Sequence, residues 1–254
     1  MAISHCLVPL AIFMVLFVQA MSVGTDLDTG GWFDARATFY GDFKGIGTVQ
    51  GACGYGDLWK QGYGLHTTAL STALFNNGLA CGVCFEIKCV NSAWCRKDAP
   101  SVLVTATNFC PPNYTKTVGV WCNPPQKHFD LTVFMFTKIA WYRAGVVPVQ
   151  ARRVPCHKIG GVKFEIKGNP YFLMVLVYNV GNAGDVSSMS IKGSNTGWLQ
   201  MAHNWGQIWD VGTNLVGQAL SFRVTTSDGK TLDFVNVAPA QWQFGQTYQS
   251  NLNF

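Results

Sequence analysis

The chain has 254 residues, enough to bury a substantial core in one large domain or in two of ordinary size. Only 12% of the residues are charged and 48% are hydrophobic, with abundant Gly, Trp, Tyr and Phe. This composition excludes a disordered or coiled-coil protein and favours a compact β-rich one. The formal net charge is +5 without a dense run of Lys or Arg, so we expect no nucleic-acid partner.

Residues 1–20 contain no charged side chain and include an apolar run from Leu7 to Val18, which is followed by Gln19 and Ala20. This pattern is typical of a secretory signal peptide with a small-residue cleavage site. A retained membrane anchor is the alternative, but the run is shorter than the ~20 residues that a spanning helix needs. We therefore predict a signal peptide at 1–20, secretion, and no transmembrane segment.

Removing the signal peptide also removes Cys6 and leaves an even number of cysteines, which predicts disulfides in a secreted chain. A zinc site is the alternative for the four closely spaced thiols from Cys81 to Cys95. The oxidising secretory route and the lack of His at matching spacing disfavour zinc. The eight remaining cysteines are Cys53, Cys81, Cys84, Cys89, Cys95, Cys110, Cys122 and Cys156.

The cysteines and the charges divide the chain at the same place. All eight cysteines precede residue 157. Residues 21–160 hold 13 Lys and Arg against 8 Asp and Glu, whereas residues 161–254 hold 5 of each. The intervening segment RRVPCHKIGG ends on paired glycines and contains no long linker, so we predict two modules, 21–160 and 161–254, in contact with each other.

In the first module, three short runs rich in β-branched and aromatic residues predict strands: ARATFYG at 35–41, CGVCFEIKC at 81–89 and SVLVTATNFC at 101–110. The segment 130–145, DLTVFMFTKIAWYRAG, instead has apolar residues at helical spacing. We predict a helix there, with Asp130 as its N-cap and Gly145 at its end.

The second module has no helical pattern. GGVKFEIKG at 160–168 alternates strictly, and YFLMVLVYNVG at 171–181 is typical of a buried strand. ALSFRVTTSDGKTLDFVNV at 219–237 predicts a hairpin that turns at Asp228 and Gly229.

A series of motifs in a fixed order resembles the α-expansins of the plant cell wall over nearly the whole mature chain. They are ATFYG, GACGYG, LSTALFNNGLACGVCFEIKC, VTATNFCPPN, HFDL, YRAG, RRVPC, SIKGSNTGW, NWGQIW, GQALSFRVTTSDGKTL and FGQTY. The resemblance implies an all-β protein with a six-stranded double-psi β-barrel, like that of family-45 endoglucanases, followed by an immunoglobulin-like β-sandwich that binds cellulose. It also implies a disulfide pairing of Cys53 with Cys81, Cys84 with Cys156, Cys89 with Cys95 and Cys110 with Cys122.

Asp130 in HFDL matches the position of the catalytic acid in family-45 hydrolases, so the resemblance implies a catalytic-like role. Its alternative role is to cap the helix. Thr38 and Tyr40 match groove residues of expansins, where the hydroxyls would hold the carboxyl group and a sugar hydroxyl; simple strand alternation is their alternative explanation. No catalytic triad, phosphate loop or metal cluster stands out, so we expect neither metal nor cofactor.

Glycosidic hydrolysis usually takes a second carboxylate opposite the acid. This sequence has Asp42 where related expansins usually have Gly, and Lys44 where they usually have Asp. One interpretation is that Asp42 is a solvated loop residue; the other is that it restores a base facing Asp130. The spacing of the two groups cannot be read from the sequence.

Exposed aromatic side chains of the second module are expected to bind the flat faces of a glucan. The resemblance places them on one face, although any single Trp in a sandwich can instead belong to the core. We favour Trp198 and Trp205 as exposed and expect Trp209 to turn inward. The candidates are Tyr171, Phe172, Trp198, Trp205 and Trp209.

Three functions remain open on the sequence. The leading one is a secreted cell-wall protein that binds cellulose and xyloglucan-like matrix glucans as a monomer and loosens their contacts without hydrolysis, favoured at acid pH. An endo-β-glucanase with Asp130 as acid and Asp42 as base is the second, and a passive carbohydrate-binding protein is the third. Asn113 begins an N-x-[ST] sequon and is a candidate for glycosylation.

Overall fold

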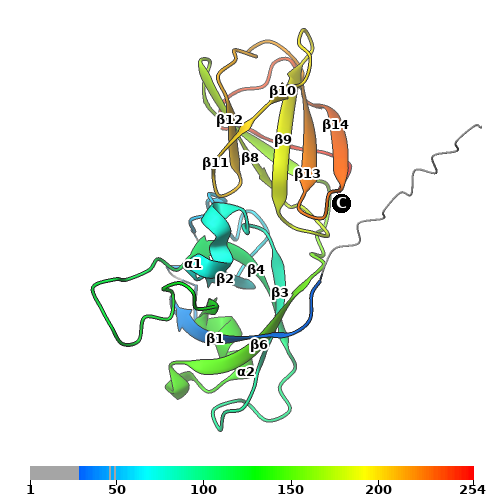
Figure 1. Ribbon diagram of the computed structural model, residues 1–254. Coiled ribbons are helices and arrows are strands. Elements are labelled where there is room, and N and C mark those ends of the chain that lie inside the picture. Colours follow the sequence, from blue (N-terminus) through cyan, green and yellow to red (C-terminus); the bar gives the residue numbers. More distant parts are fainter. Residues whose placement is uncertain (1–28, 46, 49) are drawn as a thin grey trace, which may run out of the picture.

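The computed structural model describes residues 29–254 except 46 and 49, so the predicted signal peptide at 1–20 lies outside the described residues. Figure 1 shows two β domains stacked end to end, with the N-terminal barrel below the C-terminal sandwich. The mainly β architecture confirms the predicted fold class.

The N-terminal domain is a closed barrel with the strand order β1-β5-β2-β4-β3-β6. Strands β1 and β5 pair in parallel, as do β2 and β4, whereas the other neighbours are antiparallel. Among the described residues, four short helices lie outside the barrel sheet: α1 (Thr72–Phe75), η1 (Asn76–Gly78), α2 (Val133–Ile139) and η2 (Tyr142–Ala144). The barrel strands are β1 (Phe33–Tyr40), β2 (Thr67–Leu70), β3 (Cys84–Cys89), β4 (Val102–Phe109), β5 (His128–Thr132) and β6 (Val147–Val154).

The predicted helix at 130–145 is wrong at both ends. Asp130 lies inside strand β5, and the helix α2 runs only from Val133 to Ile139. Its N-cap is Thr132, whose Oγ1 accepts a hydrogen bond from the Met135 amide at 3.3 Å. Gly145 ends η2 rather than α2. Asp130 therefore does not cap the helix.

Strand β5 is amphipathic, but its alternation could not be recognised from the apolar pattern of the sequence. Phe129 and Leu131 are fully buried in the barrel core, while His128 and Asp130 project to the other face because strand side chains alternate. The following apolar residues of α2 continue the run without a turn signal. The segment therefore resembles one long helix when only its apolar positions are counted.

All four predicted disulfides are present: Cys53–Cys81, Cys84–Cys156, Cys89–Cys95 and Cys110–Cys122. The alternative of a zinc site at Cys81, Cys84, Cys89 and Cys95 is wrong because these thiols are oxidised. The bridges tie together a barrel with long loops, and each typically contributes about 2–4 kcal/mol to the free energy of unfolding.

The C-terminal domain is a sandwich of two antiparallel sheets with the orders β10-β9-β13-β14 and β11-β12-β8-β7-β15. Its core is apolar, and Phe164 of one sheet stacks on Phe222 of the other at 4.2 Å between ring centroids. The predicted hairpin of β13 and β14 turns at Gly229, whose φ is 81°. The sandwich strands are β7 (Lys163–Asn169), β8 (Phe172–Tyr178), β9 (Val186–Gly193), β10 (Leu199–Gln200), β11 (Ala202–Trp205), β12 (Ile208–Val211), β13 (Leu220–Thr226), β14 (Thr231–Ala238) and β15 (Thr247–Gln249).

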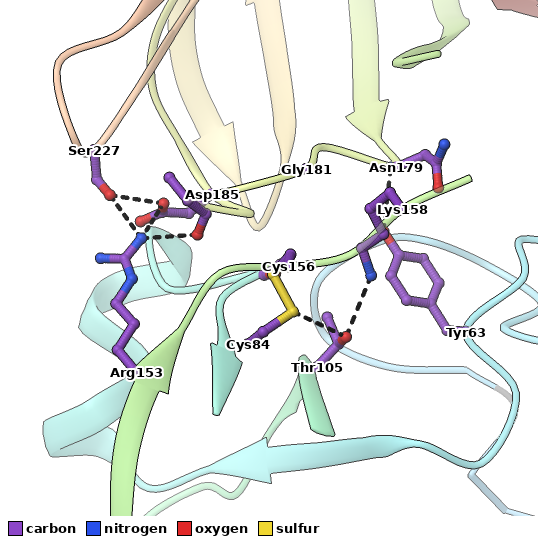
Figure 2. Close-up of a disulfide and its surroundings, with 12 residues drawn as sticks. Tyr63, Cys84, Thr105, Arg153, Cys156, Lys158, Asn179, Gly181, Asp185 and Ser227 are labelled. Atoms are coloured by element: carbon purple, nitrogen blue, oxygen red, sulfur yellow. Dashed lines mark hydrogen bonds and ion pairs between the residues drawn. A yellow bond between two sulfur atoms is a disulfide. The ribbon is translucent and has the colours of Figure 1, made fainter. Parts of the chain in front are cut away.

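The two domains share an extensive junction. Leu176 and Tyr178 of β8 belong to the same buried apolar cluster as the barrel core. Arg153 at the end of β6 donates hydrogen bonds to Asp185 at 2.6 Å and to Ser227 at 2.8 Å, both in the sandwich (Figure 2). The expected contact between the modules is therefore present and includes both apolar packing and a buried ion pair.

Main-chain atoms of the two domains also approach closely. A Cβ atom added at Gly82 would lie 2.1 Å from the Gly184 carbonyl oxygen, so the barrel and the sandwich meet there without room for a side chain. Cys156 exchanges main-chain hydrogen bonds with Asn182 at 2.7 and 2.9 Å. Figure 2 shows its disulfide with Cys84 of β3. The segment that leaves the barrel is thus held on both sides.

Candidate functional site

Asp130 and Thr38 meet because their strands are neighbours in the barrel. The parallel register of β1 and β5 places Thr38 opposite Asp130, and both side chains lie on the same face. The Thr38 hydroxyl donates a hydrogen bond to Asp130 Oδ1 at 2.6 Å. The structure therefore brings together two of the predicted groove residues.

His128 completes a chain of three polar groups. It precedes Asp130 by two residues in β5, and its Nε2 lies 2.8 Å from the Thr38 hydroxyl oxygen. Because Thr38 gives its only proton to Asp130, Nε2 must carry the proton that it donates to Thr38. His128 Nδ1 is buried and has no hydrogen-bond partner among the described residues. The imidazole thus fixes the direction in which the Thr38 hydroxyl points.

The environment moves the pKa values of the two titratable groups in opposite directions. Burial raises the pKa of Asp130 above its usual value, and the hydrogen bond from Thr38 opposes that shift only in part. Burial, with a smaller contribution from the positive charge of Arg36, lowers the pKa of His128 to about 4. At mildly acid pH the imidazole is therefore neutral, and the raised pKa of Asp130 favours its protonated form relative to an exposed Asp.

Tyr40 extends the polar face of β1 beyond Thr38. Burial is the main cause that raises the pKa of the Tyr40 hydroxyl; Asn108 and Thr67 lower it, and the negative charge of Asp130 raises it further. The hydroxyl stays protonated at physiological pH and has no hydrogen-bond partner among the described residues. The hydroxyl is buried beside Asp130, and Tyr40 is not among the residues that line the groove described below.

Asp42 lies in the exposed loop that follows β1, and its Oδ1 accepts a hydrogen bond from the Lys44 amide at 2.9 Å. This contact is the one expected of a loop carboxylate that stabilises its own turn. The role of Asp42 as a base opposite Asp130 stays a prediction.

A groove of about 280 Å³ adjoins the pair, and Thr38 and His128 form part of its wall. The opposite wall is the loop between β4 and β5, which projects to the left in Figure 1 and is closed by Cys110–Cys122. Trp121 of this loop lines the groove. The Arg36 guanidinium stacks on its ring in a cation–π contact, with Cζ 4.4 Å from the ring centroid. None of the described residues that line this groove is Asp or Glu.

Asn113 is exposed on the same loop and lines the groove. Its Oδ1 accepts hydrogen bonds from the Thr115 amide at 3.0 Å and the Thr115 hydroxyl at 2.7 Å. Glycosylation at Asn113 stays a prediction, and a glycan there would stand at the edge of the groove.

The sequence pattern alone did not point to His128 or Trp121 as site residues. His128 could have been found if 128–132 had been recognised as a strand, because a residue two positions from Asp130 then shares its face. Trp121 lies in a loop, and no periodicity indicates where a loop side chain points.

The candidate aromatic side chains of the sandwich do not form one row. Tyr171 and Phe172 are exposed at the turn between β7 and β8, and Trp205 is 42% exposed at the end of β11. Trp205 pairs with Ile208 and Ile208 with Leu176, so Trp205 and Phe172 are separated by four residues of β8, roughly 13 Å along the outer face of the five-stranded sheet. Trp205 Nε1 also donates a hydrogen bond to the Ala52 carbonyl of the barrel at 2.5 Å.

The predicted grouping on one face is wrong for two residues. Trp209 is only 3% exposed and belongs to the sandwich core, as its predicted inward orientation requires, so it cannot bind a polysaccharide. Trp198 stacks on Arg223 of the other sheet, 4.5 Å from its ring centroid. Trp198 therefore lies on the opposite sheet from Trp205 and Phe172.

The described residues contain no group of three or more His, Cys, Asp or Glu arranged to hold a metal ion. In the same part of the chain, no helix combines the length and the apolar character needed to cross a bilayer.

Comparisons with known proteins agree with this two-domain architecture. Residues 67–151 match the family described as lytic transglycolase, and residues 162–239 match the expansin C-terminal domain. A bacterial expansin from Clavibacter michiganensis has a similar fold, with a TM-score of 0.65 at 18% identity over 87% of this chain and 96% of that one. Expansin-A23 of Arabidopsis thaliana is 66% identical over 88% of this chain and 81% of its own length, and Expansin-A7 of the same plant is 50% identical over 96% of this chain and 94% of its own. The chain belongs to the expansin family.

Proposed function

We propose that this expansin is a secreted cell-wall protein that binds cellulose and matrix glucans and loosens their non-covalent contacts without hydrolysing them. Membership of the family supports this proposal, together with the relatives named as A-type expansins of Arabidopsis. A Clavibacter expansin of similar fold, with a TM-score of 0.66 at 17% identity over 88% of this chain and 98% of that one, was solved in complex with cellohexaose. By the same reasoning we infer that residues 1–20 are removed on secretion, that 21–160 and 161–254 act as its two domains, and that the protein is a monomer.

The observation that carries the proposal is a single buried carboxyl group beside a groove that has no second carboxylate among its described lining residues. Asp130 contacts the Thr38 hydroxyl, and the adjoining groove offers an imidazole, amides and an aromatic ring but no second carboxylate among its described lining residues. Hydrolysis with inversion needs a second carboxylate about 6.5–9.5 Å from the first, and retention needs one at about 5–5.5 Å. The arrangement favours hydrogen bonding to a glucan over cleavage of its backbone.

The raised pKa of Asp130 suggests how acid favours loosening. A protonated carboxyl can donate a hydrogen bond to a glycosidic or hydroxyl oxygen of the glucan, whereas a carboxylate only accepts. Thr38 and the neutral His128 hold the other side of the carboxyl group in place. Protonation therefore adds a donor beside the groove, next to Thr38 and His128 in its wall, and this donor competes with the contacts that a glucan makes to its neighbours.

The outer face of the five-stranded sheet supplies the second contact in this proposal. Phe172 and Trp205 expose ring surface there, and apolar ring faces suit the C–H faces of a glucan. We propose these two residues, with Tyr171, as the polysaccharide-binding side chains of the sandwich.

The test is a creep assay on heat-inactivated wall strips with a reducing-sugar assay on the same purified sample. We expect extension that is faster at acid than at neutral pH, without new reducing ends from soluble β-glucan. New reducing ends would instead support an endo-β-glucanase with Asp130 as acid and Asp42 as base. Retention on cellulose without creep or hydrolysis would show a passive binding protein.

A further inference from the structure

We propose that the barrel carries a second polysaccharide site, selective for polymers that bear carboxylates such as polyuronates, in two adjoining hollows along β4. The site is separate from the Asp130 groove, and no residue lines both. It goes beyond the proposed loosening of neutral glucans and does not depend on it.

The two hollows form one continuous surface. The first has a volume of about 290 Å³ and the second about 550 Å³, and His66 and Leu103 line both. The first lies beside the domain junction, where Lys158 and Pro155 follow β6, and the second reaches α2 at Lys138. Together they form a surface that runs from the domain junction to α2.

The hollows concentrate basic side chains. Their lining includes Lys158, His157, His66, Lys138 and Arg96, and none of the described lining residues is Asp or Glu. Residues 21–160 hold 13 Lys and Arg against 8 Asp and Glu, and three of those 13 cations meet here. A cleft with one sign of charge attracts ligands of the opposite sign.

Lys158 is the most constrained of these cations. Its Nζ lies 3.3 Å from the Thr105 hydroxyl and 4.6 Å from the centroid of the Tyr63 ring, and no carboxylate of the described residues is within ion-pair distance (Figure 2). A partly buried ammonium group without an anionic partner is poorly compensated. Burial lowers the pKa of Lys158 to about 8, so the group still carries its charge at acid and neutral pH. A ligand carboxylate would supply the missing partner.

One carboxylate of the protein approaches this surface but is already paired. Glu86 Oε1 accepts a hydrogen bond from the hydroxyl of Ser101, which lines the second hollow. Glu86 Oε2 forms an ion pair with Arg152 Nη2 at 2.6 Å. Arg152 thus balances Glu86, and the cations that line the hollows keep their excess of positive charge.

Apolar side chains between the cations distinguish a sugar polymer from other polyanions. Leu103 is 55% exposed at the boundary of the two hollows, and Val104, Pro155 and Met135 line the adjacent surface. A uronate residue offers C–H groups to such a surface while its carboxylate reaches a cation. No exposed Phe, Tyr or Trp ring lines either hollow among the described residues, which disfavours the stacked bases of a single-stranded nucleic acid.

Affinity electrophoresis of the full-length mature protein in gels containing polygalacturonate tests the site, with uncharged β-glucan gels and duplex DNA gels run in parallel. The first variant is Lys138→Gln with Lys158→Gln. Its matched control is Lys127→Gln with Lys192→Gln, which removes the same charge from residues that line neither the two hollows nor the Asp130 groove. Lys138→Glu is added because Lys138 is exposed and its replacement leaves the fold intact.

We expect the first variant to bind polygalacturonate about fivefold or more weakly, because each lost exposed ion pair weakens binding a few-fold. Lys138→Glu should also weaken binding, the control pair should bind almost as the wild type does, and cellulose retention and creep should be unchanged in all three. Equal losses in test and control variants would show general cation exchange and overturn the proposal, as would tighter retention by DNA than by polygalacturonate. If the wild-type protein binds polygalacturonate but produces no creep, this result would count against the proposed function instead.

Discussion

At the scale of single residues, the carboxyl group of Asp130 is the expected origin of acid activation. Its pKa is raised by burial, so its protonated fraction grows as the pH falls through that pKa. Asp130→Asn keeps the shape and a hydrogen-bond donor but cannot titrate. We expect this variant to retain part of the creep activity and to lose the difference between acid and neutral pH.

Asp42→Asn is the matched control, because it removes an exposed carboxylate close to the groove strand β1. It should creep with the wild-type pH profile. If Asp130→Asn also keeps that profile, the pH dependence originates elsewhere, for instance in the wall itself.

The Thr38 hydroxyl tunes the same titration. Its hydrogen bond stabilises the carboxylate form of Asp130 and so lowers a pKa that burial raises. Thr38→Val should raise the pKa of Asp130 further and shift the acid activation of creep to higher pH. The pKa can be followed by NMR of the Asp130 carboxyl carbon. Thr68→Val is the control, because the Thr68 hydroxyl bonds the main-chain oxygen of Asp130 at 3.0 Å and not its carboxyl group; an equal shift in both variants would rule out a specific effect of Thr38.

The sequence identified Asp130, Thr38 and Tyr40 only through their resemblance to expansin motifs. The hydrogen bonds of Thr38 to Asp130 and His128 depend on the register between β1 and β5, whose residues lie about 90 positions apart in the chain. His128 was missed for that reason, since no local pattern indicates that its Nε2 reaches a hydroxyl on another strand.

At the scale of the elements, the start of α2 is held by Thr132 and not by Asp130. The Thr132 hydroxyl accepts from the Met135 amide and donates to the Leu65 carbonyl at 2.7 Å. Thr132→Ala should lower the free energy of unfolding by about 1–2 kcal/mol, the usual cost of losing an N-cap. Denaturant unfolding measures this cost. Asp130→Asn should lose less, and a larger loss there than in Thr132→Ala would contradict the assignment of the cap.

Strands that alternate, end in a clear turn or form a long apolar run were predictable, and short strands without such signals were not. β7 alternates along GGVKFEIKG, and the hairpin of β13 and β14 carries the Asp-Gly turn signal. β2 has neither, because all four of its residues are buried. A short segment enclosed on both sides has no polar face to reveal its period.

At the scale of the whole molecule, Arg153 of the barrel joins the two domains through an ion pair with Asp185 of the sandwich. The Asp185 side chain is 8% exposed; its burial raises its pKa and Arg153 lowers it. Arg153→Met leaves this carboxylate without its cation and should cost about 3–5 kcal/mol of unfolding free energy at neutral pH. Without Arg153 the pKa of Asp185 rises further, so protonation removes the penalty and the cost should shrink as the pH falls.

Thermal unfolding at several pH values checks this prediction. Arg223→Met is the control, because Arg223 forms an exposed ion pair with Asp233 within the sandwich. It should change stability much less and without the same pH dependence. Equal losses in the two variants would show that the junction does not depend on the Arg153 pair.

The sequence did not predict on which sheet of the sandwich each aromatic residue lies. Trp198 and Trp205 are seven positions apart, yet they lie on different sheets because the chain crosses between β10 and β11. Composition predicted enough exposed rings for a binding surface, but which rings share a sheet is set by strand order.

The tight junction between the domains fixes the distance between the two proposed glucan-binding sites. The disulfide at Cys156, the close main-chain contact of Gly82 with Gly184, and the bond from Trp205 to Ala52 hold the Asp130 groove and the outer sheet face at a constant spacing. A glucan oligomer that is shorter than this spacing can occupy one site or the other but gains nothing from the second. Affinity should therefore rise in a step, not smoothly, once the oligomer is long enough to bridge both sites.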